Sequence, residues 1–158
     1  GKFFEHKVVY ISKVWFPDFA NYRRDGYDFD ARYDEGLAKH TDKVLYDLLD
    51  SHAPIISKEL KKLGDYRKGG NKGFDTAIIR LQEQCYVITS NFAYMTDKNG
   101  QPYGWGVAEY STPEKFMGAA FTDKVYQREP EESYQLILDH LKKILPQASM
   151  EQIKKILK

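Results

Sequence analysis

Residues 42–63 read DKVLYDLLDSHAPIISKELKKL, residues 74–84 read FDTAIIRLQEQ, and two β-prone runs follow, joined by the turn DKNG at 97–100. A proline divides the first stretch into two amphipathic segments, and a third precedes a change to a two-residue period. Three helices followed by a hairpin, in this order, predict a winged helix-turn-helix. Such a fold presents its third helix and its hairpin together, on a surface suited to a nucleic-acid duplex.

The first helix is predicted from apolar residues that recur on one side: Val44, Leu45, Leu48 and Leu49. Pro54 ends this helix, because the proline ring removes a hydrogen-bond donor and pushes the preceding residue out of helical geometry. Ser57 is expected to cap the second helix, and Gly64 to supply the left-handed residue after it. Leu60 and Leu63 are expected to face the core.

The third helix is predicted from residues four, three and four positions apart: Phe74, Ile78, Leu81 and Cys85. The single cysteine permits no intramolecular disulfide and is expected to be a buried structural thiol. The opposite face, predicted to look toward the major groove, carries Thr76, Ile79, Arg80 and Glu83. The alternative is that this face is only the solvated side of an amphipathic helix.

Two strands are predicted at 85–94 (CYVITSNFAY) and 103–110 (YGWGVAEY), because both runs are rich in β-branched or aromatic residues. The Asn99-Gly100 pair between them is a strong hairpin signal. The large residues of the second strand fall on one face and the small ones, Gly104, Gly106 and Ala108, on the other. The bare face either packs under a helix or receives a closely approaching ligand.

Positive charge is concentrated in one part of a chain whose net charge is only +1. From Ser57 to Arg80 there are seven basic and three acidic residues, and the loop DYRKGGNKG at 65–73 is the richest part. Its glycines would let backbone amides approach a phosphate, and its cations would make the affinity salt-sensitive. We therefore expect double-stranded DNA as a partner, contacted through Arg67, Lys68, Lys72, Thr76, Arg80, Lys98 and Asn99. A solvated, flexible loop without a partner is the alternative.

Three parts of the chain are predicted: an aromatic-rich N-terminal segment at 1–40, the winged helix-turn-helix at 41–111 and a C-terminal helical brace at 112–158. The first part holds ten aromatic residues, which are expected to pack on a neighbouring core. Stacking against unpaired bases is the sharper alternative. This part is expected to begin with a strand within 7–16, followed by a turn at Pro17-Asp18 and a helix containing Asn21–Arg24.

The C-terminal part is predicted to be helical. Thr112 is expected to cap a short helix with a proline in its first turn, which Gly118 closes. A longer helix follows Pro130, and Ser149 caps a last one. These helices would brace the preceding domain or pair with a second copy, so a homodimer is an open alternative.

Motifs for catalysis are few. The four histidines are scattered without metal spacing and no nucleotide-binding glycine loop occurs, so we expect neither a metal nor a cofactor. The acidic run DGYDFDARYDE at 25–35 lacks the spacing of a calcium loop and is expected to be a polar turn and helix start. Without a long apolar run or a signal peptide, we expect no membrane association and a cytoplasmic location. The chain starts with Gly rather than Met, and we expect further residues upstream.

Three runs carry a family resemblance: residues 1–24 (GKFFEHKVVYISKVWFPDFANYRR), 73–88 (GFDTAIIRLQEQCYVI) and 100–118 (GQPYGWGVAEYSTPEKFMG). They resemble mostly uncharacterised bacterial proteins related to winged-helix DNA glycosylases, which excise alkylated purines and unhook interstrand crosslinks. The resemblance implies tandem winged helices, no metal, and hydrolysis of an N-glycosidic bond by a polar motif that activates water.

In those glycosylases the catalytic motif is Gln-x-Gln or Gln-x-Asp near the start of the protein. Gln82 and Gln84 match these letters but lie at the end of the predicted third helix. Residues two apart on a helix point about 200° apart, so we expect helix-terminal hydrogen bonding rather than catalysis.

Three functions therefore compete. The leading hypothesis is a DNA-binding winged-helix protein related to alkylation-repair glycosylases, as a non-catalytic relative. The second is an active, metal-independent glycosylase acting on alkylated purines. The third is a winged helix used for protein interaction or dimerisation. Whether the chain is an enzyme is left open by its residues.

Overall fold

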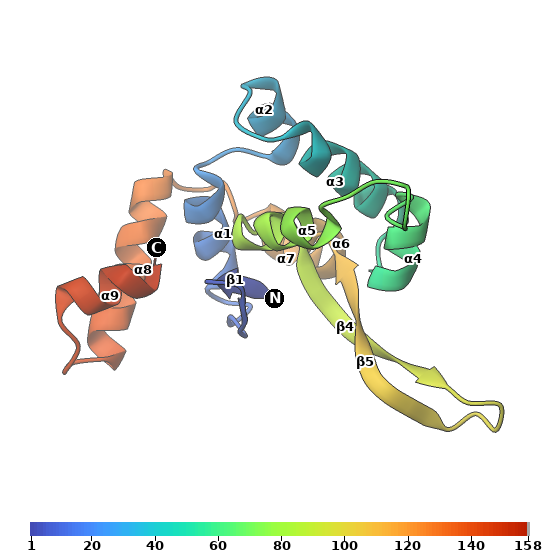
Figure 1. Ribbon diagram of the computed structural model, residues 1–158. Helices are drawn as coiled ribbons and strands as arrows, with labels where there is room; N and C mark the ends of the chain where they lie inside the picture. The colour runs from blue at the N-terminus through green and yellow to red at the C-terminus, as the bar shows by residue number, and fades with distance from the viewer. Residues whose placement is uncertain (158) are drawn as a thin grey trace.

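Helices make up about half of the computed structural model, which describes residues 1–157 and contains two small antiparallel sheets (Figure 1). The chain is therefore α+β, as its sequence predicts. Its first elements are β1 (Lys2–Phe4), β2 (Lys7–Val8), α1 (Phe16–Arg24) and α2 (Phe29–Asp34). The central ones are α3 (His40–His52), β3 (Ile55–Ile56), α4 (Ser57–Leu63), α5 (Phe74–Glu83), β4 (Ile88–Thr96) and β5 (Pro102–Ser111). The last are α6 (Pro113–Met117), α7 (Ala119–Thr122), α8 (Pro130–Ile144) and α9 (Met150–Leu157).

The central region contains the three predicted helices and the predicted hairpin, in the expected order. A short strand that was not predicted, β3, lies between α3 and α4 and completes a sheet of order β3-β5-β4. Ile55 of β3 pairs with Tyr110 of β5, and Ile88 of β4 pairs with Ser111 of β5. These pairings attach the base of the hairpin to the helices.

Three details of α4 differ from the prediction. Ile56 occupies the N-cap position and makes no side-chain cap, so the helix starts at Ser57 itself. Gly64 has φ −82°, and the left-handed residue is Asp65, one position later (φ 53°). Leu63, the last residue of the helix, is 49% exposed rather than in the core, whereas Leu60 is fully buried.

The end of α5 also differs from the prediction. The helix stops at Glu83 and β4 starts at Ile88, so Cys85 belongs to neither element and turns the chain with φ 62°. The prediction of a buried thiol is confirmed, since Cys85 has no exposed surface and burial raises its pKa to about 12. Because of this tight turn, Tyr86 and Val87, which follow Cys85, are fully buried in the core.

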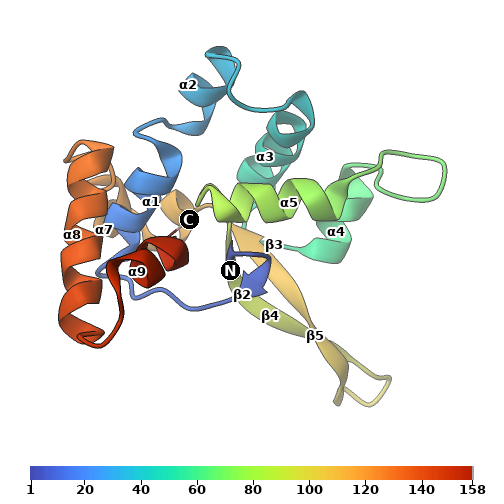
Figure 2. The ribbon, with the colours of Figure 1, turned by 60° about the vertical axis from the view of Figure 1, so that its left-hand side comes forward.

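The predicted strand over 7–16 is wrong for most of its length, because only Lys7–Val8 pair, with β1. The following residues cross the molecule without regular structure, and Val9, Ile11 and Trp15 pack against the core (Figure 2). Pro17 does not form a turn but lies in the first turn of α1, where its missing N–H costs nothing. The acidic run does begin a helix, since Asp28 accepts a hydrogen bond from the Ala31 amide at the start of α2.

Two hydrophobic cores hold these elements together. The first joins the N-terminal aromatic residues to the C-terminal helices and includes Phe3, Phe16, Phe19, Phe121, Leu138 and Ile153. The second lies among the central helices and includes Phe29, Leu45, Leu49, Leu60, Ile78, Leu81 and Tyr86. The aromatic segment and the C-terminal helices therefore share one core, although they lie at opposite ends of the sequence.

The C-terminal caps are confirmed. The hydroxyl of Thr112 accepts a hydrogen bond from the Lys115 amide at the start of α6, and Gly118 follows its last residue. Ser149 accepts one from the Gln152 amide at the start of α9. No helix within residues 1–157 has the length and apolar character that a bilayer crossing demands.

Gln82 connects three elements from a fully buried position. Its Oε1 accepts hydrogen bonds from the Lys2 amide of β1 (3.0 Å) and the Thr89 hydroxyl of β4 (3.3 Å), and its Nε2 donates to the Ile78 carbonyl (3.2 Å). The hydrogen-bonding role expected of this glutamine is confirmed. Both polar atoms of its amide are therefore engaged by the fold.

Replacing Gln82 by Ala should lower the free energy of unfolding by about 1–3 kcal/mol, because half-buried donors on β1 and β4 lose their acceptor. Gln84→Ala is the matched control, since that side chain makes none of these bonds, and it should leave stability nearly unchanged. Urea denaturation measures both. Equal losses for the two variants would contradict this role of Gln82.

Alkaline pH should destabilise the fold. The folded protein holds the proton of Cys85 up to a pKa of about 12, whereas the unfolded thiol loses it near its ordinary pKa of 9.0. The stabilisation is complete below pH 9 and is lost as pH rises toward 12, at about 1.4 kcal/mol per pH unit for one group. Urea denaturation between pH 8 and 10.5 should show a shallower decline for Cys85→Ala, and an unchanged slope would contradict the assignment.

Candidate nucleic-acid interface

The loop between α4 and α5 is held in one shape by its own hydrogen bonds. The Asn71 amide donates to the Asp65 carbonyl (2.8 Å), and the Asn71 side chain donates to the Gly64 carbonyl (2.8 Å). Gly70 is required here, because a Cβ atom at that position would lie 2.2 Å from the Asp65 carbonyl oxygen. The basic loop, residues 65–73, therefore projects from the fold in a defined conformation.

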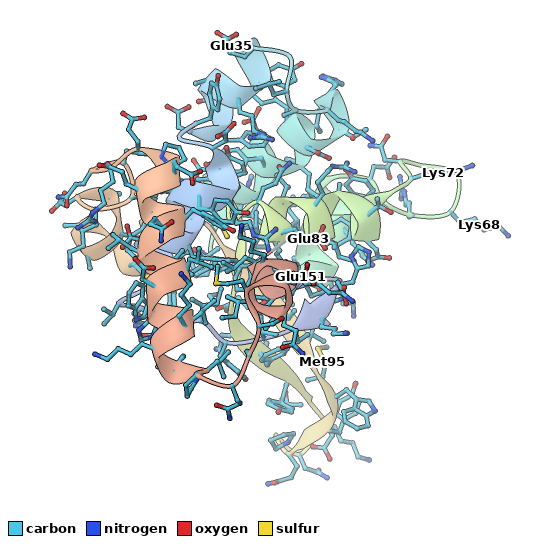
Figure 3. All side chains as sticks on the ribbon, turned by 90° about the vertical axis from the view of Figure 1, so that its left-hand side faces the viewer. Glu35, Lys68, Lys72, Glu83, Met95 and Glu151 are labelled. Carbon is cyan, nitrogen blue, oxygen red and sulfur yellow. The ribbon has the colours of Figure 1, made fainter. Side chains whose placement is uncertain are left out.

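Lys68 and Lys72 point outward from the basic loop (Figure 3), and within residues 1–157 neither has an ion-pair partner. Arg67 is exposed as well, but its Nε lies 2.5 Å from Oδ1 of Asp65. The two lysines are therefore the most available positive charges of the loop.

The surface of α5 is less open than predicted. Thr76 is exposed, but the Arg80 guanidinium binds Asp42 of α3 through two hydrogen bonds of 2.5 Å, and Asp42 is 1% exposed. These bonds raise the pKa of Arg80. Glu83 accepts from the His6 amide (3.4 Å) in the β1–β2 turn. Arg80 therefore joins two helices in this structure, and sequence spacing alone gave no sign of its buried partner.

The tip of the hairpin is a compact polar turn. Oδ1 of Asp97 accepts hydrogen bonds from the amides of Asn99 (2.8 Å) and Gln101 (2.9 Å), as Asp commonly does in turns. Lys98 and Asn99 are both exposed at this tip. Neither side chain is bonded to another group among residues 1–157, so both can meet a partner without any change in the turn.

The basic loop and the hairpin project from the same side of the molecule, whereas α8 and α9 lie on the other side (Figures 1 and 2). The seven predicted contact residues thus come from three places: the loop, the exposed part of α5 and the hairpin tip. The structure brings six of them to the surface and uses Arg80 inside the fold.

The hairpin also exposes large rings that the sequence only partly indicated. Trp105 is 95% exposed, between Gly104, whose φ is 75°, and Gly106. At Gly106 the nearest neighbours are Phe92 and Tyr94 of β4, so the small face is covered by the partner strand at this point, not by a helix. The exposed rings of the hairpin are Phe92, Tyr94, Tyr103 and Trp105.

A metal site has no candidate ligands in the described part of the chain, since no three His, Cys, Asp or Glu side chains of residues 1–157 are grouped to hold an ion. The surface chemistry of this region is instead that of lysines, hydroxyl and amide groups, and aromatic rings. Such groups bind phosphates and bases.

Replacing Arg80 by Ala should lower the free energy of unfolding by about 3–5 kcal/mol, because the buried Asp42 carboxylate would lose its cation. Thr76→Ala, one helical turn earlier and exposed, is the control and should leave stability unchanged. Thermal or urea denaturation compares them. If Arg80→Ala proved as stable as the control, the ion pair would not stabilise the fold.

Comparison with known proteins gives one match. No curated protein and no solved structure matches the chain. The model of the AlkZ-related family matches residues 1–158, which is the whole chain. AlkZ is an interstrand-crosslink DNA glycosylase. The chain therefore belongs to the AlkZ-related family and is related to DNA glycosylases.

Proposed function

We propose that this chain is a DNA-binding winged-helix protein that recognises duplex DNA through the basic loop, α5 and the hairpin tip. The order α3, β3, α4, α5, β4, β5, with the strands arranged β3-β5-β4, supports this assignment. In a winged helix, the third helix and the hairpin meet the duplex together. The observation that carries the proposal is that the loop before α5 and the hairpin project on one side (Figure 2).

Phosphate contacts come mainly from Lys68 and Lys72 of the basic loop, and from Lys98 at the hairpin tip. Arg67 joins them when it exchanges Asp65 for a phosphate, which a guanidinium can bind through two hydrogen bonds. Each neutralised phosphate contributes roughly 0.9 to the slope of log affinity against log salt. Because the net charge of the chain is only +1, we expect it to contact a short stretch of duplex and not to coat DNA.

The polar side chains that remain on this surface refine the contact. The Thr76 hydroxyl on α5 reaches a phosphate or a base edge, and the Asn99 amide at the hairpin tip has both donors and an acceptor for a groove edge. Arg80 holds α5 against α3 and thus fixes the angle at which α5 is presented. Residues 41–111 form the binding domain in this proposal, with 1–40 and 112–158 supporting it.

Glycosylase activity is the second candidate, favoured by membership of the AlkZ-related family. The Gln82-Glu83-Gln84 run does not supply its catalytic pair, because the Gln82 amide is buried and bonded on both sides. A base-release assay on an N7-alkylated duplex separates the two candidates. Release would make the protein an enzyme, and binding without release would make it a non-catalytic relative.

Replacing both Lys68 and Lys72 by Ala should weaken duplex binding and make the slope of log affinity against log salt shallower by about 1.8, the effect of two lost phosphate contacts. The matched control is the pair Lys142 and Lys143 on α8, on the other side of the molecule (Figure 2). Fluorescence anisotropy with a labelled duplex across a salt titration measures both.

An unchanged slope in the loop variant, or an equal change in the α8 variant, would contradict the proposed surface. Absence of duplex binding by the unmodified protein at about 50 mM salt would instead favour a role in protein interaction or dimerisation, with the exposed hairpin rings as the contact.

A further inference from the structure

Two hollows meet on the surface away from the basic loop, where the segment after β2 passes the base of the hairpin. The first, the apolar pocket, has a volume of about 240 Å³ and walls from residues 8–13, the start of β4 and α6. Its apolar lining includes Ile11, Phe16, Ile88, Phe92 and Phe116. Pockets for drug-sized ligands measure roughly 300–1,000 Å³, so this one suits a single planar ring system.

Two hydroxyl groups give the apolar pocket a polar edge. Thr89 donates its proton to Gln82 Oε1 (3.3 Å), and Ser90 donates its proton to Glu109 Oε1 (2.9 Å). Both residues line the pocket, and each hydroxyl oxygen keeps lone pairs that can accept a further hydrogen bond. The pocket thus combines an apolar interior with acceptors for an amino group on a ring.

The second hollow, the lysine groove, lies between the β1–β2 turn and α9 and has a volume of about 1300 Å³. Its floor is apolar and includes Phe4 and Ile156. Lys154 and Lys155 of α9 line it and have no ion-pair partner within residues 1–157, whereas Lys7 pairs with Glu5 at 3.2 Å. Two glutamates, Glu5 and Glu151, line the groove as well, so its three lysines leave a net charge of +1 beside the apolar floor.

Tyr10 and Val9 line both hollows, so the pocket and the groove are neighbours. Tyr10 is 93% exposed, which means that its ring contributes little to the packing of the fold. Lys13, a third cation, lines the pocket with its Nζ 5.2 Å from the Phe116 ring centre. An exposed ring between an apolar pocket and a pair of lysines is the arrangement that binds a base together with its phosphates.

We propose that the two hollows form one site for an unpaired nucleotide within a nucleic-acid strand. The base enters the apolar pocket and stacks on Tyr10, and the adjoining phosphates lie on Lys154 and Lys155. The hydroxyl oxygens of Thr89 and Ser90 favour a base edge that carries an amino group. This inference rests on the proposed DNA binding and adds a second site, separate from the basic loop.

The test compares binding of the full chain to two labelled duplexes, one fully paired and one with a single bulged adenine. The unmodified protein should bind the bulged duplex about tenfold more tightly, because stacking of one base on an aromatic ring is of this order. Tyr10→Ala should remove this preference and leave the affinity for the paired duplex unchanged. Tyr10→Phe should retain it.

Controls separate this site from the duplex surface. Val14→Ala, in the same irregular segment and 80% exposed, should keep the preference for the bulged duplex. The Lys68 and Lys72 double variant should weaken both complexes equally and keep the ratio. Replacing Lys154 and Lys155 by Ala should reduce the salt dependence of the bulged complex alone.

Paired-duplex binding without a preference for the bulge would overturn the nucleotide site and leave the proposed function standing. A preference that survives Tyr10→Ala would also overturn it. Failure to bind either duplex would remove both proposals. Thermal denaturation of each variant confirms folding, which the exposure of Tyr10 and Val14 predicts to be unaffected.

Discussion

The buried guanidinium of Arg24 joins the two hydrophobic cores, because it lies 4.6 Å from the ring centre of Tyr86 in one and 5.1 Å from that of Phe121 in the other. It is 1% exposed and donates hydrogen bonds to Glu114 Oε1 (2.7 Å), the Tyr126 hydroxyl (2.8 Å) and the Cys85 carbonyl (2.8 Å). Burial works to lower its pKa, but Glu114 and Tyr126 more than offset this and raise it, so Arg24 stays charged. Because Cys85 lies just before β4, this cluster fixes where the hairpin leaves the body of the protein.

The relative position of the two proposed contact surfaces depends on this Arg24 cluster. The basic loop and the hairpin belong to the part of the chain built around the central core, whereas α9 packs in the core shared by the two ends of the sequence. The apolar pocket lies between them, with walls from residues 8–13, β4 and α6. The proposed duplex surface and the proposed nucleotide site are therefore held at a fixed separation.

Local patterns predicted the local structure well. Apolar spacing placed α3, α5 and α8, and the Asn-Gly turn placed the hairpin, because these signals depend on neighbouring residues. The strand expected within 7–16 failed because a strand also needs a partner, which only Lys7–Val8 find. The pairing of Arg80 with Asp42, 38 positions earlier, and the pocket beside Tyr10 depend on tertiary contacts that no local pattern carries.

Amide chemical-shift mapping by NMR, during titration with a short duplex, tests the DNA-binding surface most directly. The account predicts that the largest changes fall on residues 65–73, the first turn of α5 and the hairpin tip at 97–100, with little change along α8. Changes concentrated on α8, or none at saturating duplex, would contradict it.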